Sequence, residues 1–162
     1  MLKNIIYTTS SQNPYPSTDY LNVWIVEELC ASCTPGDCLV AGFSSFPADH
    51  GTDLDGIVIE SRSWYNDRQP CEFIKVGMHE MGHYFGLYHT FQGGCFNNDC
   101  HRHGDKVCDT PPDDNFNIYW DHPCLQGGSY NSCSTDGRDN SPDNPFAGMD
   151  VDDLNDNFMD YA

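Results

Sequence analysis

Residues 79–90 read His-Glu-Met-Gly-His-Tyr-Phe-Gly-Leu-Tyr-His-Thr, and this stretch decides most of what the sequence predicts. His79 and His83 are four positions apart, so on a helix they share one face, where two imidazoles can bind one Zn²⁺ at about 2.0–2.1 Å. Glu80 is too close to the first histidine to be a third ligand, but it can reach a water on the metal. Gly86 can end the helix with a positive φ and let His89 turn back to the same metal. Three nitrogen ligands and one open position are typical of a catalytic zinc site.

The motif His-Glu-x-x-His is short enough to occur by chance, and the alternative interpretation is an amphipathic helix with two surface histidines. Two further features of the sequence bear on this choice. The first is the third histidine, which follows a glycine and favours the zinc site. Far downstream, residues 157–161 read Asn-Phe-Met-Asp-Tyr. Alone, Met159 would be interpreted as a core side chain, because thioethers fill gaps in cores.

In this order, the stretches resemble the metzincin zinc peptidases, which carry a tight turn with a methionine (the Met-turn) beneath the zinc-binding histidines. His-Thr-Phe at 89–91, Gly-Gly-Cys at 93–95 and Gly-Asp-Lys-Val-Cys-Asp-Thr-Pro-Pro at 104–112 narrow the resemblance. They are similar to the pappalysin family of metzincins, in particular its ulilysin-like branch. The resemblance covers roughly residues 20–161, and the zinc helix and the Met-turn are its specific parts.

The resemblance implies a secreted zinc-dependent endopeptidase with His79, His83 and His89 as metal ligands. A zinc-bound water would attack the scissile carbonyl while Glu80 acts as general base and then passes the proton to the leaving amine. Tyr161 would help to bind the tetrahedral intermediate, and the alternative is a packed tyrosine. Gly86 and Met159 would be structural.

The predicted fold class is α/β (α+β) and metzincin-like. Strands are expected over 21–26, as a central strand, over 39–46, ended by Pro47, and over 56–60. A helix is expected over 71–85, with apolar residues at helical spacing: Phe73, Ile74, Met78, Met81 and Phe85. The small twisted mixed sheet and the helix would form an upper subdomain.

The domain organisation follows from the same patterns. Residues 1–19 are expected to be an irregular entry segment, and residues 20–162 a catalytic domain. Its upper subdomain would extend to about residue 86, and a loop-rich, disulfide-bonded lower subdomain would span about 87–162. The resemblance also implies a substrate strand that adds to the edge strand at 39–46, and a C-terminal helix after the Met-turn, which we expect to be missing from this chain.

Composition restricts the possible partners. Seven Lys and Arg face 25 Asp and Glu, a formal net charge of −18 that argues against binding nucleic acid or an anionic membrane. No run of about 18 apolar residues predicts a membrane span. Nine cysteines indicate an oxidising compartment, although the N-terminus lacks the apolar stretch of a signal peptide. We therefore expect a secreted monomer, without its signal and pro-segments in this chain, that acts on proteins or peptides.

Nine cysteines cannot all pair within the chain. The resemblance implies a disulfide between Cys95 and Cys133, which would leave Cys124 unpaired. Cys30 and Cys33 form a C-x-x-C, for which a disulfide-bonded loop is favoured over a redox pair or half a zinc site. Six cysteines exceed the family pattern, and the sequence alone does not say how they pair: Cys30, Cys33, Cys38, Cys71, Cys100 and Cys108.

The acidic residues could bind Ca²⁺, which takes six to eight oxygens, although none of the clusters has the EF-hand spacing. The resemblance implies calcium near Asp105, Asp109 and Thr110. The acidic cluster that contains this region is Asp99, Asp105, Asp109, Asp113 and Asp114. Solvated loops are favoured for the other two acidic clusters: Asp49, Asp53 and Asp55; and Asp150, Asp152, Asp153 and Asp156. His101 and His103 could hold a second metal, but surface histidines are the favoured interpretation.

Two further functions are compatible with the sequence. One is a non-catalytic or incomplete metzincin scaffold that binds zinc or peptide without turnover. The other is a calcium-dependent structural module with an incidental zinc site. Zinc content separates the last from the others, and turnover separates an enzyme from an inactive scaffold.

Overall fold

The computed structural model describes residues 15–27, 29, 41–61, 72–114, 131–134, 136–154 and 156–160. The chain divides into two compact units, Met1–Gly86 and Leu87–Ala162. The first unit contains the described sheet and the long helix. The described residues of the second unit lie almost entirely in turns and loops.

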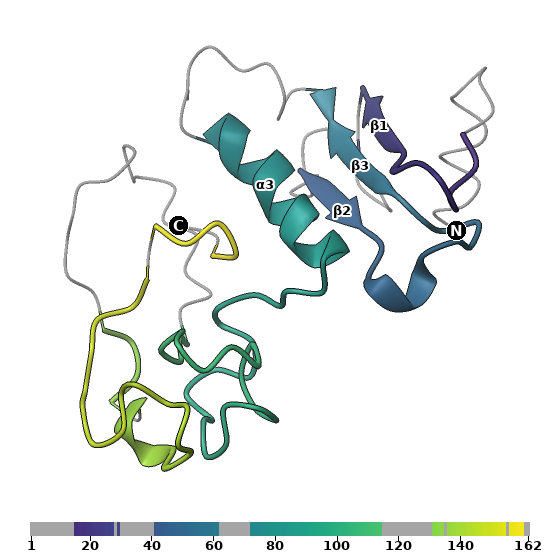
Figure 1. Ribbon diagram of the computed structural model, residues 1–162. Helices are drawn as coiled ribbons and strands as arrows, with labels where there is room; N and C mark the ends of the chain where they lie inside the picture. The colour runs from purple at the N-terminus through teal and green to yellow at the C-terminus, as the bar shows by residue number, and fades with distance from the viewer. Residues whose placement is uncertain are drawn as a thin grey trace. The chain divides into compact units, whose positions relative to one another are not determined.

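The sheet of the first unit has three strands: β1 (Val23–Val26), β2 (Gly42–Ser44) and β3 (Ile57–Glu60). The strand order is β1-β3-β2, with β1 parallel and β2 antiparallel to β3 (Figure 1). The small mixed sheet that the sequence predicts is therefore confirmed.

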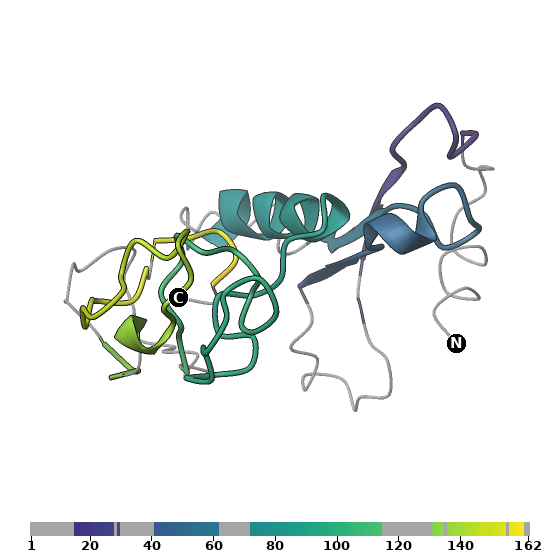
Figure 2. The same ribbon diagram turned by 60° about the horizontal axis from the view of Figure 1, so that its bottom comes forward.

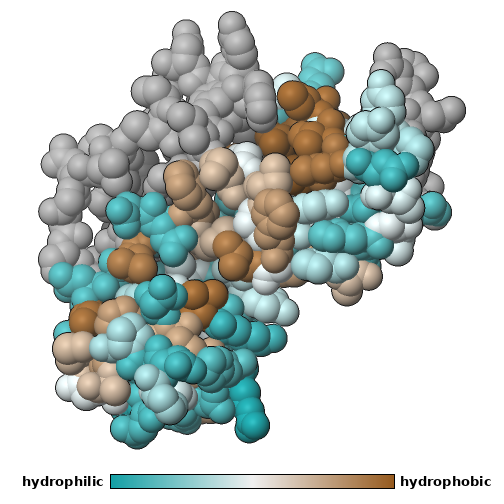
Figure 3. All heavy atoms as spheres, viewed as in Figure 1, coloured by the Kyte–Doolittle hydropathy of each residue, from teal (hydrophilic) through white to brown (hydrophobic). Residues whose placement is uncertain are grey.

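The central strand of the described sheet is β3, so the prediction of a central strand at 21–26 was wrong. All four residues of β3 are at most 5% exposed, whereas Val23 and Ile25 of β1 are 46% and 51% exposed. The almost continuous apolar run Ile-Val-Ile of β3 is typical of a strand that is buried on both faces. Figure 3 shows hydrophobic residues gathered over β1 and β3.

The strand β2 is shorter than the predicted 39–46. Residues 39 and 40 lie outside the described residues, and the chain leaves the sheet after Ser44. A 3₁₀ helix, η1, follows at Pro47–Asp49. Proline suits a first helical turn because its missing N–H would have no partner there. Pro47 therefore begins a helical turn where the sequence predicted the end of a strand.

The helix α3 spans Glu72–Tyr84, close to the predicted 71–85. It packs against β2 and β3, and both ribbon views show it beside them (Figures 1 and 2). Its buried face carries His79, Glu80 and His83. Met78 is exposed, and so is Phe85 just beyond the helix, so these apolar positions do not face the core as their spacing predicted.

Disulfides hold the second unit together. Cys95 pairs with Cys133, which confirms the predicted bridge, and Cys100 pairs with Cys108, which the sequence left open. The regular structure described here is one 3₁₀ helix, η2, at Asp136–Arg138. The other five cysteines lie outside the described residues: Cys30, Cys33, Cys38, Cys71 and Cys124.

Within the described residues, no helix combines the length and the hydrophobicity that crossing a bilayer requires.

Candidate metal centre

The first element of the candidate site is the histidine pair on α3. The Nε2 atoms of His79 and His83 are 3.1 Å apart, and the two rings stand edge to face. Both residues are buried. Two nitrogens at about 2.05 Å from a tetrahedral zinc would be about 3.3 Å apart. The pair therefore fits two ligands of one zinc ion.

Aromatic packing fixes the end of the helix that carries this pair. The ring of Phe46, which follows β2, lies 5.3 Å from the ring of His83, centroid to centroid. His50 stacks on Tyr84 at 4.1 Å. The segment between β2 and β3 therefore contacts the last turn of α3, where the second histidine sits.

Glu80 lies on the same buried face of the helix. Its exposed fraction is 5%, and burial raises the pKa of its carboxyl to about 7. Within the described part of the chain, its Oε2 atom has no hydrogen-bond partner. A nearby cation would lower this pKa, because it favours the charged carboxylate. A carboxyl group in this environment can accept and return a proton near neutral pH.

The chain leaves the helix directly after these residues. The N–H of Phe85 donates to the carbonyl of Met81, and the N–H of Gly86 donates to that of His83. Gly86 has a φ of 93°, in the region that disfavours a residue with a Cβ. His89 follows three positions later and is the candidate third ligand.

The second unit places the residue next to His89 beside the Met-turn. The N–H of Thr90 donates to the carbonyl of Met159 at 3.2 Å. The turn itself is closed by the N–H of Asp160 donating to the carbonyl of Asn157 and by the N–H of Met159 donating to the Asn157 side chain. Met159 is buried. Tyr161 lies outside the described residues, so its predicted role stays a prediction.

The predicted calcium ligands lie in a tight turn of the second unit. The N–H of Val107 donates to the Asp105 carboxylate at 2.9 Å. Burial raises the pKa of Asp105 to about 6, with the charge of Asp109 adding to it, while hydrogen bonds from Val107 and the Thr110 hydroxyl oppose the rise. Among the described residues, the groups of three or more side chains that could hold one metal ion do not include Asp105 or Asp109. Calcium here stays a prediction.

Two aspartates that the sequence assigned to solvated loops, Asp55 and Asp153, are buried, so that interpretation was wrong for them. Asp153 accepts the N–H of Ser132, and Asp55 accepts the N–H of Gly51 at 2.6 Å. Asp113, which belongs to the cluster considered for calcium, is also buried and accepts the Ser132 hydroxyl. Asp55 and Asp153 thus satisfy backbone N–H groups that lie outside helices and strands.

Asp136 and Asp139 belong to the same class, and the sequence analysis missed them. Asp136 accepts the N–H of Val151, and Asp139 accepts the N–H groups of Cys100 and Ser141. Burial acts to raise the pKa of Asp139. Hydrogen bonds from Ser141 and Cys100 and the charge of His101 outweigh burial and hold this pKa below its usual value. Aspartate two residues before a serine, as in Asp139-Asn-Ser, is a turn signal that could have been used.

A second group of ligand atoms gathers at Cys100, His101 and Cys108. Its two sulfur atoms form a disulfide, so they are not available as thiolate ligands. His101 is exposed and lies 3.1 Å from Asp143. The favoured interpretation of His101 as a surface histidine agrees with this exposure.

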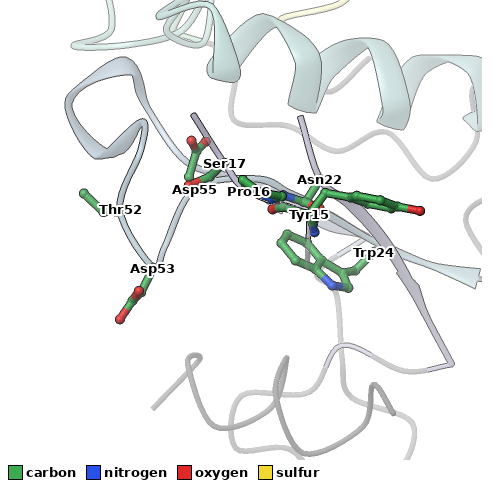
Figure 4. Close-up of a pocket in the computed structure, with 8 residues that line it drawn as sticks. All are labelled: Tyr15, Pro16, Ser17, Asn22, Trp24, Thr52, Asp53 and Asp55. Atoms are coloured by element: carbon green, nitrogen blue, oxygen red, sulfur yellow. Dashed lines mark hydrogen bonds between the residues drawn. The ribbon is translucent and has the colours of Figure 1, made fainter. Parts of the chain in front are cut away.

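The first unit also has a pocket of about 210 Å³. Figure 4 shows the aromatic rings of Tyr15 and Trp24 on one side of it and the loop with Thr52 and Asp53 on the other. None of its lining residues belongs to α3. It is smaller than typical ligand pockets of 300–1,000 Å³. The residues that line it do not include His79 or His83.

Comparison with known proteins identifies the family. The peptidase family model described as Pregnancy-associated plasma protein-A matches residues 8–162. The chain belongs to this peptidase family. The resemblance to pappalysins that the sequence motifs indicate is thereby confirmed.

The relatives of this pappalysin chain include secreted fungal enzymes by name. An extracellular metalloprotease of Neurospora crassa is 32% identical over 157 residues, which are 88% of this chain and 41% of that protein. An extracellular metalloprotease of Pyricularia oryzae is 36% identical over 135 residues, which are 81% of this chain and 38% of that protein. The chain thus spans about two fifths of the length of these relatives.

Solved structures agree on the fold. Mature mirolysin of Tannerella forsythia, in complex with a cleaved peptide, superposes with a TM-score of 0.52 and 24% identity. The match covers 72% of this chain and 41% of that chain. The pappalysin chain therefore has the metzincin-like α/β fold that the sequence predicts.

Proposed function

We propose that this chain is the catalytic region of a secreted zinc-dependent endopeptidase. The observation that carries the proposal is the buried face of α3, where two imidazole nitrogens 3.1 Å apart lie next to a buried carboxylate. A family of metalloproteases supplies the reaction class.

The proposed zinc ligands are His79, His83 and His89. Each offers a ring nitrogen, and neutral imidazole is the ligand type that catalytic zinc sites use most. Three residues span at most about 10 Å, so the turn at Gly86 keeps His89 close to the end of the helix. A zinc ion bound there would polarise the scissile carbonyl and make water more acidic.

Glu80 is the proposed general base. It takes a proton from the attacking water and gives it to the amine that leaves when the peptide bond breaks. It directly follows the proposed ligand His79 in the helix, and burial removes its side chain from bulk water. Tyr161 is proposed to bind the negatively charged oxygen of the tetrahedral intermediate through its phenol.

The proposed substrate is an extended peptide or protein segment. In the described sheet, β2 pairs on one side with β3 and forms an edge. An extended peptide can add to such an edge through main-chain hydrogen bonds, which demand little of its side chains. Mirolysin has been solved with a cleaved peptide, which supports this substrate class.

Other partners are restricted by charge. The net charge of −18 argues against nucleic acid as a partner. For the oligomeric state, we propose a monomer.

Secretion and calcium complete the proposal. The relatives are named extracellular, and two disulfides of the described residues suit an oxidising compartment. A calcium ion at Asp105, Asp109 and Thr110 would offset the repulsion between the two carboxylates there.

The deciding experiment compares the 162-residue chain with its Glu80→Gln variant. Cleavage of a fluorescent casein is measured with and without a zinc chelator, and the zinc content of both proteins is measured in parallel. We expect chelator-sensitive cleavage by the wild type. In the variant we expect about one zinc per chain and activity lower by about 10²–10⁴-fold, since the amide cannot accept the proton. The exposed Glu27 offers a matched control, and Glu27→Gln is expected to cleave normally.

The outcomes separate the candidate functions. Normal cleavage by Glu80→Gln would show that another group is the base. Zinc bound at one ion per chain with no cleavage by the wild type would instead favour a non-catalytic or incomplete scaffold. Cleavage without any bound zinc would reject the proposed metal centre.

A further inference from the structure

The side chain of Glu80 occupies the space in front of a glycine on the neighbouring strand. A Cβ atom placed on Gly42 of β2 would lie 2.9 Å from both Cγ and Oε1 of Glu80. It would also lie 3.1 Å from the carbonyl oxygen of Val58. Real Cβ atoms essentially never come within 3.0 Å of another group, so a side chain at position 42 and the present position of Glu80 exclude each other.

Backbone conformation does not explain this glycine. Gly42 is not among the glycines with a positive φ, so its backbone has a conformation that any residue could adopt. Glycine is unfavourable inside a strand, because it loses more conformational entropy than other residues and offers no side chain to pack. A glycine in a strand often marks the close approach of another group. Here the group that approaches is the carboxylate-bearing side chain of Glu80.

One oxygen of the Glu80 carboxylate is not held by a hydrogen bond. The side chain is buried between α3 and the sheet, where α3 packs against β2 and β3 (Figures 1 and 2). Its Oε2 atom has no hydrogen-bond partner among the described residues. The direction in which the carboxylate points therefore depends on packing, and the backbone of Gly42 is one wall of that packing.

We propose that Gly42 is a positioning residue for Glu80, because the missing side chain at position 42 is what lets the carboxylate take its place on the buried face of α3. The inference rests on the proposed function only in assigning Glu80 as the general base. The contact between the two residues stands on the structure alone. Gly42 itself touches no reacting atom in this proposal.

The expected effect of Gly42→Ala falls on turnover more than on folding. Two of the three atoms that the new methyl group would meet belong to a flexible side chain, so Glu80 moves aside more easily than the strand does. A displacement of about 1 Å of a catalytic group can cost about 10²-fold in rate. We expect kcat to fall by about 10–100-fold, with KM and zinc content changed by less than about twofold.

A double-mutant cycle tests the contact without any use of activity. The melting temperature is measured for Gly42→Ala in the wild type and in Glu80→Ala, which lacks both Cγ and Oε1. We expect the loss caused by Gly42→Ala in the wild type to shrink or reverse in Glu80→Ala, because the methyl group then fills vacant space. Ser44→Ala lies two residues along the same strand and is the matched control. Its effect should be the same in both backgrounds.

The outcomes overturn the inference and the proposed function separately. Equal effects of Gly42→Ala in the two backgrounds would overturn the contact. A coupled melting temperature with unchanged kcat would overturn the positioning role while the enzyme remains an enzyme. If the wild type itself fails to cleave casein, the proposed function fails and the positioning role fails with it. If Gly42→Ala does not fold but the double variant does, the contact is supported.

Discussion

Met159 shows how a single residue gains its meaning from its surroundings. From sequence alone a methionine is most simply a core side chain, and the resemblance to metzincins gave it a place in the Met-turn. The structure shows both aspects, because the side chain is 5% exposed and the carbonyl accepts the N–H of Thr90, the residue after His89. The second unit thus joins the candidate third ligand to the Met-turn through one backbone hydrogen bond.

Truncation of this side chain should destabilise the second unit. We expect Met159→Ala to lower the free energy of unfolding by about 2–5 kcal/mol, through lost burial and the cavity left behind. Met149→Ala makes the same chemical change at a residue that is 50% exposed, and should cost less than about 0.5 kcal/mol. Urea denaturation followed by fluorescence measures both. Equal losses would show that Met159 is not a core residue.

At the scale of elements, the sequence pattern predicts the bounds of α3 well, but it does not predict which face of the helix is buried. The spacing of its apolar residues predicted the helix to within a residue at each end. The same spacing suggested that Met78 would face the core, yet the buried face carries His79, Glu80 and His83. A helix that buries polar side chains is unstable in isolation, so the packing of β2 and β3 must support it.

The end of α3 can be tested through Gly86. An alanine at position 86 would have to adopt a φ near 93°, and its Cβ atom would lie 3.2 Å from Cγ of Pro47. Gly86→Ala therefore combines backbone strain with crowding. Gly51 has a similar φ of 77° with nothing within 4 Å, so Gly51→Ala isolates the strain. We expect about 1–2 kcal/mol of destabilisation for Gly51→Ala and a larger loss for Gly86→Ala. Thermal melts by circular dichroism would contradict this if Gly51→Ala lost as much as Gly86→Ala.

At the scale of the whole molecule, disulfides supplement the few buried apolar side chains among the described residues of the second unit. The bridge Cys95–Cys133 closes a loop with a separation of 38 residues, and Cys100–Cys108 one of 8. Loop entropy predicts about 4 kcal/mol and about 2.5 kcal/mol of stabilisation respectively. We expect Cys95→Ala with Cys133→Ala to shift the urea midpoint further than Cys100→Ala with Cys108→Ala. The reverse order would show that loop entropy does not dominate.

The many buried carboxylates make stability depend on pH. Burial raises the pKa of Asp136 above its usual value near 3.8, and the charge of Asp150 adds to the rise. A folded-state pKa above the unfolded one means that the folded protein binds the proton more tightly. This contribution to stability is complete below pH 3.8 and is lost as the pH rises through the raised pKa.

Replacement of this carboxyl by an amide should remove the pH-dependent contribution. Relative to the wild type, we expect the melting temperature of Asp136→Asn to become more favourable as the pH rises from about 4 to about 7 in calcium-free buffer. Asp152→Asn, at an exposed aspartate, should follow the wild type in parallel. Scanning calorimetry at several pH values measures the difference. A constant difference for Asp136→Asn would show that its pKa is not raised.

The helix with its two histidines could be predicted from the sequence because it depends on the local spacing of residues along the chain. The family and the small mixed sheet could be predicted because the zinc motif and the Met-turn are short motifs that can be recognised wherever they stand in the chain. The sequence also determined the bridge Cys95–Cys133 through the resemblance. Only the tertiary structure decided that β3 is central, that Cys100 pairs with Cys108 and that Asp55 and Asp136 are buried. It alone showed that Gly42 makes room for Glu80. These features depend on which distant segments meet in space, and periodicity along the chain carries no record of that.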